Sequence, residues 1–163
     1  MLALLALWLL ATLGLRPLLL PDEGRYVGVA REMFYGDAWV PLLNGLPFFH
    51  KPPLMYWLDM AAMSALGVNL FSARFASFVG AWLMGAALFL AVRRWHGPRA
   101  AMDALLVLAT CPFFFIGGQY ANHDMLVAGL ITATVLAFVR AVDDPHPALR
   151  WVLAAWGLAA LAV

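Results

Sequence analysis

Long apolar runs separated by short charged clusters set the predicted elements of this chain. Residues 1–15, 75–92 and 104–123 contain no Asp, Glu, Lys or Arg. A helix that crosses a membrane needs about 20 consecutive, mainly apolar residues. The pattern therefore predicts membrane spans over about 1–20, 75–95, 100–119 and 122–141, followed by a fifth, incomplete span over 149–163.

The segment between the first two spans, residues 21–68, is the most polar part of the chain and is expected to be a structured outer loop. Asp22 follows Pro21, which predicts a helix start with Asp22 as the N-cap. A turn at Asn44-Gly45 separates this helix from a second one predicted over 54–66. Both helices are too short for a confident span, so we expect short amphipathic or interfacial helices.

Composition limits the class of protein to which this chain belongs. Hydrophobic residues make up 65% of its 163 positions and charged residues only 12%, whereas soluble domains carry about 25% charged residues. A disordered chain and a secreted disulfide scaffold are excluded, because the chain is apolar and Cys111 is its single cysteine. The net charge of +1 gives no reason to expect a nucleic-acid partner. We predict an all-α integral membrane protein.

The arginines predict the orientation of the spans. Residues 93–99 carry three arginines and no acid, which is typical of a short cytoplasmic loop. Alternating sides then places the N-terminus in the cytoplasm and segments 21–68 and 117–124 together on the outer side. The two loops that carry Asp22 and Asp124 are therefore expected to face each other.

Several strings in the outer loop resemble one enzyme family. Asp22-Glu23-Gly24-Arg25-Tyr26 is followed by the string from His50 and Lys51-Pro52-Pro53 to Trp57, and then by Asn122-His123-Asp124. In this order they resemble the polyprenyl-phosphate-dependent glycosyltransferases related to the aminoarabinose transferase of lipid A and to the protein O-mannosyltransferases. The resemblance covers essentially the whole chain, as the N-terminal part of a longer enzyme, and Val163 would then fall in mid-span.

The resemblance implies a GT-C membrane glycosyltransferase in a bacterial inner membrane. It would move a sugar from a polyprenyl-phosphate carrier to a lipid, glycan or protein acceptor on the periplasmic side. The catalytic residues would be Asp22 and Asp124, and the remaining site residues would bind the donor phosphate (Lys51 and Arg25) or the substrate (Tyr26 and Glu23).

The chemistry of the reaction suits these residue types. A departing phosphate needs cationic neutralisation, which Lys51 and Arg25 supply. A hydroxyl acceptor must lose its proton to a base such as Asp22. A phosphate acceptor needs no base, and Asp22 would then stabilise the positive charge that develops on the sugar during transfer. His50 stands where relatives of the lipid A enzyme carry Glu, so it is a candidate ligand for a divalent metal ion.

Each of these residues also has a structural interpretation. Asp22 is also consistent with a simple helix cap, Lys51 with an interfacial lysine, and Arg25 with a partner of Glu32 or another nearby acid or with a contact to lipid head groups. Asp59 is interpreted as a helix-end charge. Two other classes of protein also fit the pattern, a membrane transporter and a non-catalytic membrane scaffold. The chain shows no inverted repeat of the kind that transporters carry.

Overall fold

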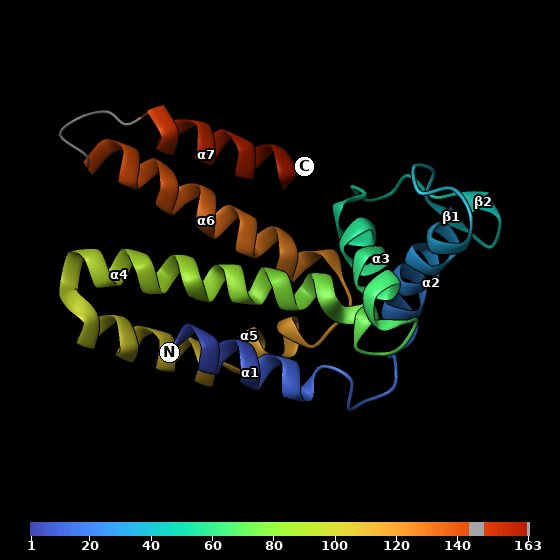
Figure 1. Cartoon of the computed structure of the whole chain (residues 1–163), viewed down its shortest axis with the longest axis horizontal. Coiled ribbons are helices and arrows are strands. Elements are labelled where there is room, and N and C mark those ends of the chain that lie inside the picture. The colour runs from blue at the N-terminus through green and yellow to red at the C-terminus, as the bar shows by residue number, and fades with distance from the viewer. Residues whose placement is uncertain (144–148, 163) are drawn as a thin grey trace.

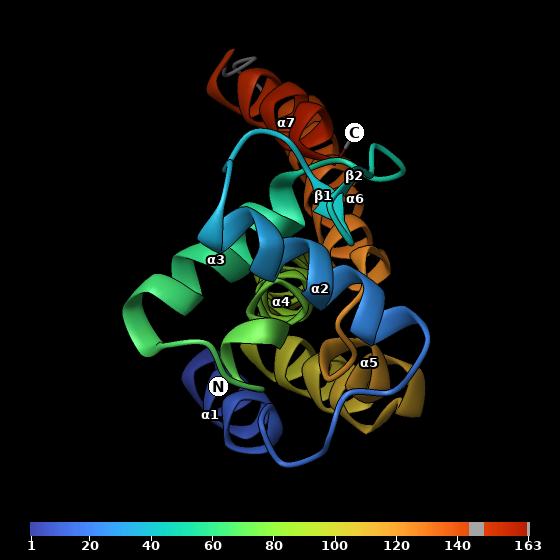
Figure 2. The ribbon, with the colours of Figure 1, turned by 90° about the vertical axis from the view of Figure 1, so that its right-hand side faces the viewer.

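The computed structural model describes residues 1–143 and 149–162 of the chain. Two layers are visible: a bundle of long apolar helices and a cap of two shorter helices at one end of it (Figure 1). The bundle consists of α1 (Leu2–Thr12), α4 (Phe75–Thr110), α5 (Pro112–Gly118), α6 (His123–Asp143) and α7 (Leu149–Leu161), and the cap of α2 (Asp22–Tyr35) and α3 (Leu54–Leu66). Figure 2, which looks onto the cap, shows α2 lying across the end of α4.

α4 reverses direction at Gly97. This residue has φ +86° and ψ 175°, a left-handed conformation that a side chain would strain. The part of α4 after Pro98 runs back along the bundle beside the part before Gly97 (Figure 1). The arginine-rich segment 93–99 therefore forms a helix–helix turn at the end of the bundle opposite to α2 and α3.

The predicted span over 100–119 is not one helix. α4 ends at Thr110, Cys111 is extended with ψ 117°, and α5 begins at Pro112. The cause is local, because Pro112 has no N–H to donate and its ring disfavours a helical conformation at the preceding residue.

The first predicted span is also shorter than expected. α1 ends at Thr12, and none of the residues from Leu13 to Leu20 belongs to a helix. Within the part of the chain that the structure describes, two helices are long and apolar enough to cross a membrane, Ser72–Thr110 (including the 3-10 turn Ser72–Arg74) and His123–Asp143.

The cap departs from an all-α fold in one detail. β1 (Leu42–Leu43) pairs antiparallel with β2 (Leu46–Pro47) across the predicted turn at Asn44-Gly45. The Glu32 carboxylate accepts hydrogen bonds from the backbone N–H groups of Asn44 (2.7 Å) and Gly45 (3.0 Å), which holds this hairpin against α2. The second predicted helix is present over 54–66 as α3.

The bundle packs through small residues where α4 crosses α6. A Cβ added at Gly129 would collide with the carbonyl oxygen of Gly80, and one added at Gly80 would collide with the backbone of Met125 and Leu126. Glycines at such positions let helix backbones approach closely, as is common between helices in membranes. This contact fixes the start of α6 beside the first turns of α4.

Candidate active site

A buried ion network joins the cap to the bundle. The Glu23 carboxylate is fully buried and accepts from Arg74 Nε (2.9 Å) and Arg16 Nη1 (2.6 Å). It also accepts backbone N–H groups from Leu19 (2.7 Å) and Ala121 (2.8 Å). One side chain of α2 thereby holds three other segments of the chain: residues 16–19, the start of α4, and the turn before α6.

Arg74 satisfies all of its donors within this network. Its guanidinium is fully buried, and besides the two bonds to Glu23 it donates to the carbonyl oxygens of Leu13 (3.1 Å), Arg16 (3.0 Å) and Pro17 (3.0 Å). A guanidinium has five N–H donors, and each finds an acceptor here. These carbonyls are available to Arg74 because α1 has already ended at Thr12.

The network determines the charge of Glu23. Burial by itself would raise the pKa of the Glu23 carboxyl, but hydrogen bonds from Arg74, Arg16, Ala121 and Leu19 outweigh it and lower the pKa to about 2. Glu23 is therefore ionised at neutral pH and both of its oxygens are engaged. This geometry gives Glu23 a structural role, while its contact with substrate stays a prediction.

Asp22 and Arg25 lie next to this network but at the surface. Asp22 is in the first turn of α2, whose N-cap is Pro21, so the predicted capping role of Asp22 is wrong. The Asp22 carboxylate instead accepts from Arg25 Nη2 at 3.1 Å, and the two side chains are 50% and 39% exposed. Arg25 thus pairs with Asp22, not with Glu32. Both groups remain accessible for chemistry.

Asp124 lies at the start of α6 and faces a groove of about 330 Å³ that Tyr120 and Asn122 also line. Its carboxylate accepts from Asn122 Nδ2 at 2.9 Å, and the side chain is exposed. Burial, together with the negative charges of Asp22 and Glu23, raises the pKa of the Tyr120 hydroxyl. Besides lining this groove, the ring of Tyr120 lies under the guanidinium of Arg16, 5.6 Å from its centroid, so it joins the groove to the Glu23 network.

Lys51 and His50 line a second groove, of about 400 Å³, that precedes α3. Lys51 is exposed, and the ring of His50 stacks on Phe48 with 4.5 Å between centroids. No group of three or more His, Cys, Asp or Glu side chains able to hold a metal ion occurs in the described ranges 1–143 and 149–162. A single histidine is not a metal centre, so these residues do not by themselves fit the predicted divalent ion.

His123 joins the two halves of the cap to α6. Its ring is 4% exposed and makes T-shaped contacts with Tyr26 from α2 (4.9 Å between centroids) and Tyr56 from α3 (5.2 Å). Both ring nitrogens of His123 and the hydroxyl of Tyr56 are buried without a hydrogen-bond partner among the described residues. Tyr26, a predicted substrate residue, is thus partly committed to packing against His123.

Asp59 is a buried residue and not the helix-end charge that the sequence predicted. It is fully buried, and its Oδ1 accepts the backbone N–H of Ala76 at 2.9 Å. Ala76 is in the first turn of α4, where N–H groups have no acceptor within their own helix. Burial raises the pKa of the Asp59 carboxyl well above its usual range, against the opposing hydrogen bond from Ala76.

Sequence reasoning missed the network of Glu23, Arg74 and Arg16, although one signal for it was present. Arg16 interrupts an apolar run in which a charge is expensive unless it is paired. Its partner Glu23 is only seven residues away, but the second cation on Glu23, Arg74, is 51 residues away in the chain, so no local pattern revealed the network.

Comparison with known proteins decides the family. The sequence profile described as dolichyl-phosphate-mannose–protein mannosyltransferase matches residues 50–162. The chain belongs to this family. An undecaprenyl phosphate-alpha-4-amino-4-deoxy-L-arabinose arabinosyl transferase from Pseudomonas savastanoi pv. phaseolicola is 36% identical to it over 166 residues, covering 98% of this chain and 30% of the relative. A second transferase of that name, from Sodalis glossinidius, is 32% identical and covers 90% of this chain and 27% of the relative.

Solved structures of this family agree with the fold. ArnT from Cupriavidus metallidurans, bound to undecaprenyl phosphate, superimposes with a TM-score of 0.90 at 29% identity. That match covers 99% of this chain and 31% of ArnT. The apo form of ArnT gives a TM-score of 0.88 at 30% identity, with 99% of this chain and 31% of ArnT covered. The resemblance read from the sequence is therefore confirmed, and the chain spans about 30% of the length of the relatives it matches.

Proposed function

We propose that this chain forms part of a membrane glycosyltransferase that transfers a sugar from a polyprenyl-phosphate carrier to an acceptor on the extracytoplasmic side. The observation that carries the proposal is the Glu23 network, which ties the start of α2 to the turn before α6. The network keeps the starts of α2 and α6, which carry Asp22 and Asp124, at the end of the bundle where α3 also lies (Figure 1). The groove of Lys51 directly precedes α3.

Lys51 and Arg25 are proposed to hold the donor phosphate. Both are exposed or half-exposed cations on the cap. A phosphate leaves as a stable anion, so its departure is assisted by fixed positive charge and does not require a general acid. Approach of the phosphate to Arg25 would exchange one anionic partner, Asp22, for another and leave the Asp22 carboxylate free.

Asp22 and Asp124 are proposed to act at the reacting centre. With a hydroxyl acceptor, one carboxylate takes the acceptor's proton as the new glycosidic bond forms. With a phosphate acceptor, the carboxylates stabilise positive charge that develops on the sugar. The accessible Asp22 suits either task, whereas Glu23, with six hydrogen bonds to its two oxygens, suits neither.

The proposed donor is an undecaprenyl-phosphate-linked amino sugar of the aminoarabinose type, and the proposed acceptor is a lipid. Support comes from the names of the relatives and from the structure of ArnT with undecaprenyl phosphate. A divalent ion would need ligands in addition to His50 from another part of the protein. We propose the inner membrane as the location, with the cap facing the periplasm.

The test measures sugar transfer by the complete protein that contains this chain. Lys51→Ala is expected to lower turnover about 10²–10³-fold, as does loss of one electrostatic contact in an active site. The matched control is Arg31→Ala, which removes an exposed cation of α2 that lies outside the groove of Lys51. Equal activity of the two variants would remove Lys51 from the mechanism.

Asp22→Asn separates chemistry from structure. The ion pair of Asp22 with Arg25 is half-exposed and contributes about 0–1 kcal/mol, so folding should be unaffected. We expect a severe loss of transfer at normal protein levels, while the control Asp37→Asn, at another exposed acid of the cap, stays active. A fully active Asp22→Asn protein would show that Asp22 has no catalytic role.

A further inference from the structure

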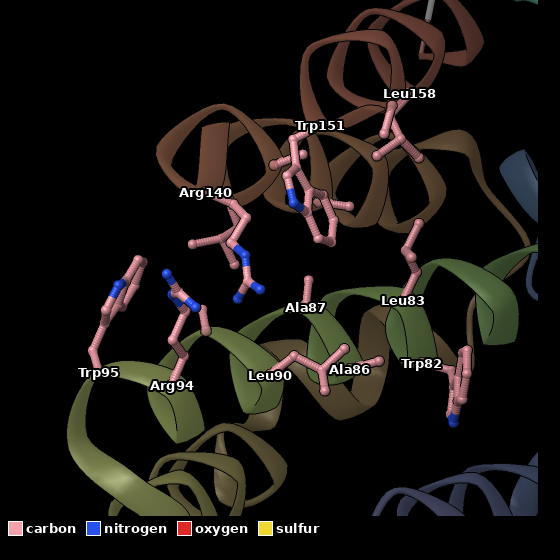
Figure 3. A pocket seen from close by; sticks show the side chains of 15 residues that line it. Trp82, Leu83, Ala86, Ala87, Leu90, Arg94, Trp95, Arg140, Trp151 and Leu158 are labelled. Atoms are coloured by element: carbon pink, nitrogen blue, oxygen red, sulfur yellow. The ribbon is translucent and has the colours of Figure 1, made fainter. Parts of the chain in front are cut away.

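A groove at the other end of the bundle lies between α4, α6 and α7 (Figure 3). It encloses about 350 Å³ and is separate from the grooves of Lys51 and Asp124. The groove is hollow because all three helices present small residues to it. The alanines that line it are Ala86, Ala87, Ala91, Ala133, Ala137 and Ala154.

One end of this groove is cationic. Arg94 of α4 and Arg140 of α6 both line it, and Figure 3 shows their side chains pointing toward one another. Arg140 lies over the ring of Trp151, 5.0 Å from its centroid, and its Nε is buried without a hydrogen-bond partner within the described part of the chain. Two facing guanidinium groups repel each other unless an anion lies between them.

Asp143 does not neutralise Arg94 or Arg140 in the described structure. Asp143 accepts from Trp95 Nε1 at 2.8 Å and forms no ion pair with either arginine among the described residues. In the sequence, residues 93–99 and 140–150 together carry five arginines against Asp143 and Asp144. The excess of positive charge at this end favours an anionic ligand.

We propose that the groove between α4, α6 and α7 binds an anionic phospholipid. Its phosphate lies between Arg94 and Arg140, and an acyl chain lies along the alanines and Leu90. A free phosphate would leave the apolar part empty, and an apolar helix would leave the arginines without an anion. Basic pockets between membrane helices bind anionic headgroups on the cytoplasmic side, where the arginine-rich turn is predicted to lie. Trp95 and Trp151 line the cationic end of the groove, and tryptophan is enriched where a membrane protein meets the headgroup layer.

The test uses the complete protein, purified in detergent and titrated with palmitoyl-oleoyl phosphatidylglycerol or the matching phosphatidylcholine, with bound lipid counted by native mass spectrometry. We expect tight binding of phosphatidylglycerol, weak binding of phosphatidylcholine and no competition by inorganic phosphate. The double variant Arg94→Gln/Arg140→Gln should lose affinity for phosphatidylglycerol by about thirtyfold, roughly fivefold for each arginine.

The control Arg93→Gln/Arg99→Gln removes the same amount of charge from the same end of the bundle, at positions that do not line the groove. It should change the affinity less than about threefold. Equal losses of affinity in the two double variants would show that phosphatidylglycerol responds only to the overall positive charge at this end of the bundle. That result would overturn the proposal. Failure of the unmodified protein to retain phosphatidylglycerol would also overturn it.

A second variant tests the apolar part with both arginines intact. Ala87→Trp places an indole in the groove and should lower the affinity for phosphatidylglycerol about tenfold, whereas Ala61→Trp on an exposed face of α3 should not. Unchanged binding in Ala87→Trp would contradict an acyl chain in this groove, even if Arg94→Gln/Arg140→Gln does not fold.

Discussion

Glu23→Gln is expected to destabilise the protein strongly, although it changes one atom and preserves shape. The carboxylate of Glu23 neutralises the fully buried Arg74 and the partly buried Arg16. An amide at this position carries no charge, and its NH₂ group would face N–H donors where an oxygen now accepts. The substitution therefore leaves a buried guanidinium without an anion and breaks hydrogen bonds at the junction of cap and bundle.

The magnitude follows from the pKa of Glu23. A shift from the ordinary value of 4.5 to about 2 corresponds to about 3 kcal/mol of stabilisation at neutral pH. Removal of one partner from a buried ion pair typically costs about 3–5 kcal/mol. We expect Glu23→Gln to lose a similar amount. Because the pKa is lower in the folded state, this stabilisation is complete above pH 4.5 and disappears as the pH falls toward 2.

Equilibrium unfolding of the purified protein in mixed detergent measures the free energy at pH 7 and at several values down to pH 2. The difference between wild type and Glu23→Gln should shrink across the window from 4.5 to 2. Glu32→Gln is the matched control, since Glu32 also accepts two backbone N–H groups, but at exposed hydrogen bonds, and it should cost about 1 kcal/mol or less.

Two results would refute this reasoning. One is a loss of unfolding free energy in Glu23→Gln that is no larger than the loss in Glu32→Gln. It would mean that another group neutralises the charge of Arg74. The other is a difference from wild type that does not depend on pH, which would mean that packing, and not charge, is responsible for the effect.

Three further predictions concern stability and topology. Asp59→Asn should be tolerated, because its amide oxygen can accept the same N–H of Ala76 and burial disfavours the charged form of the carboxyl that it replaces. Asp59→Ala should cost about 1–3 kcal/mol by leaving this helix N–H unsatisfied, and unfolding measurements that rank the two variants alike would contradict this role. Gly129→Val should separate α4 from α6 and reduce the yield of folded protein in size-exclusion chromatography, and a normal profile would contradict the close crossing. In a Cys111→Ser background, an impermeant thiol reagent applied from outside should label Asn44→Cys and not His96→Cys, and the opposite labelling would reverse the predicted orientation.

The sequence by itself determined the class and the family of this protein. Apolar runs of membrane length and a low charged fraction required a helical membrane protein, because such a chain has too few polar side chains to cover a soluble surface. The strings around Asp22 and Lys51 identified the glycosyltransferase family, since they are local in the chain. The turn at Asn44-Gly45 and the helix over 54–66 were predictable for the same reason.

Only the tertiary structure decided which charged residues are structural and which are accessible. Asp22 and Glu23 are neighbours in the sequence, yet Asp22 is half-exposed while Glu23 is fully buried against Arg74. Asp59 is buried because α3 packs against the start of α4. No local pattern encodes these outcomes, because desolvation and pairing depend on segments that are distant in the chain and come together only when the helices pack.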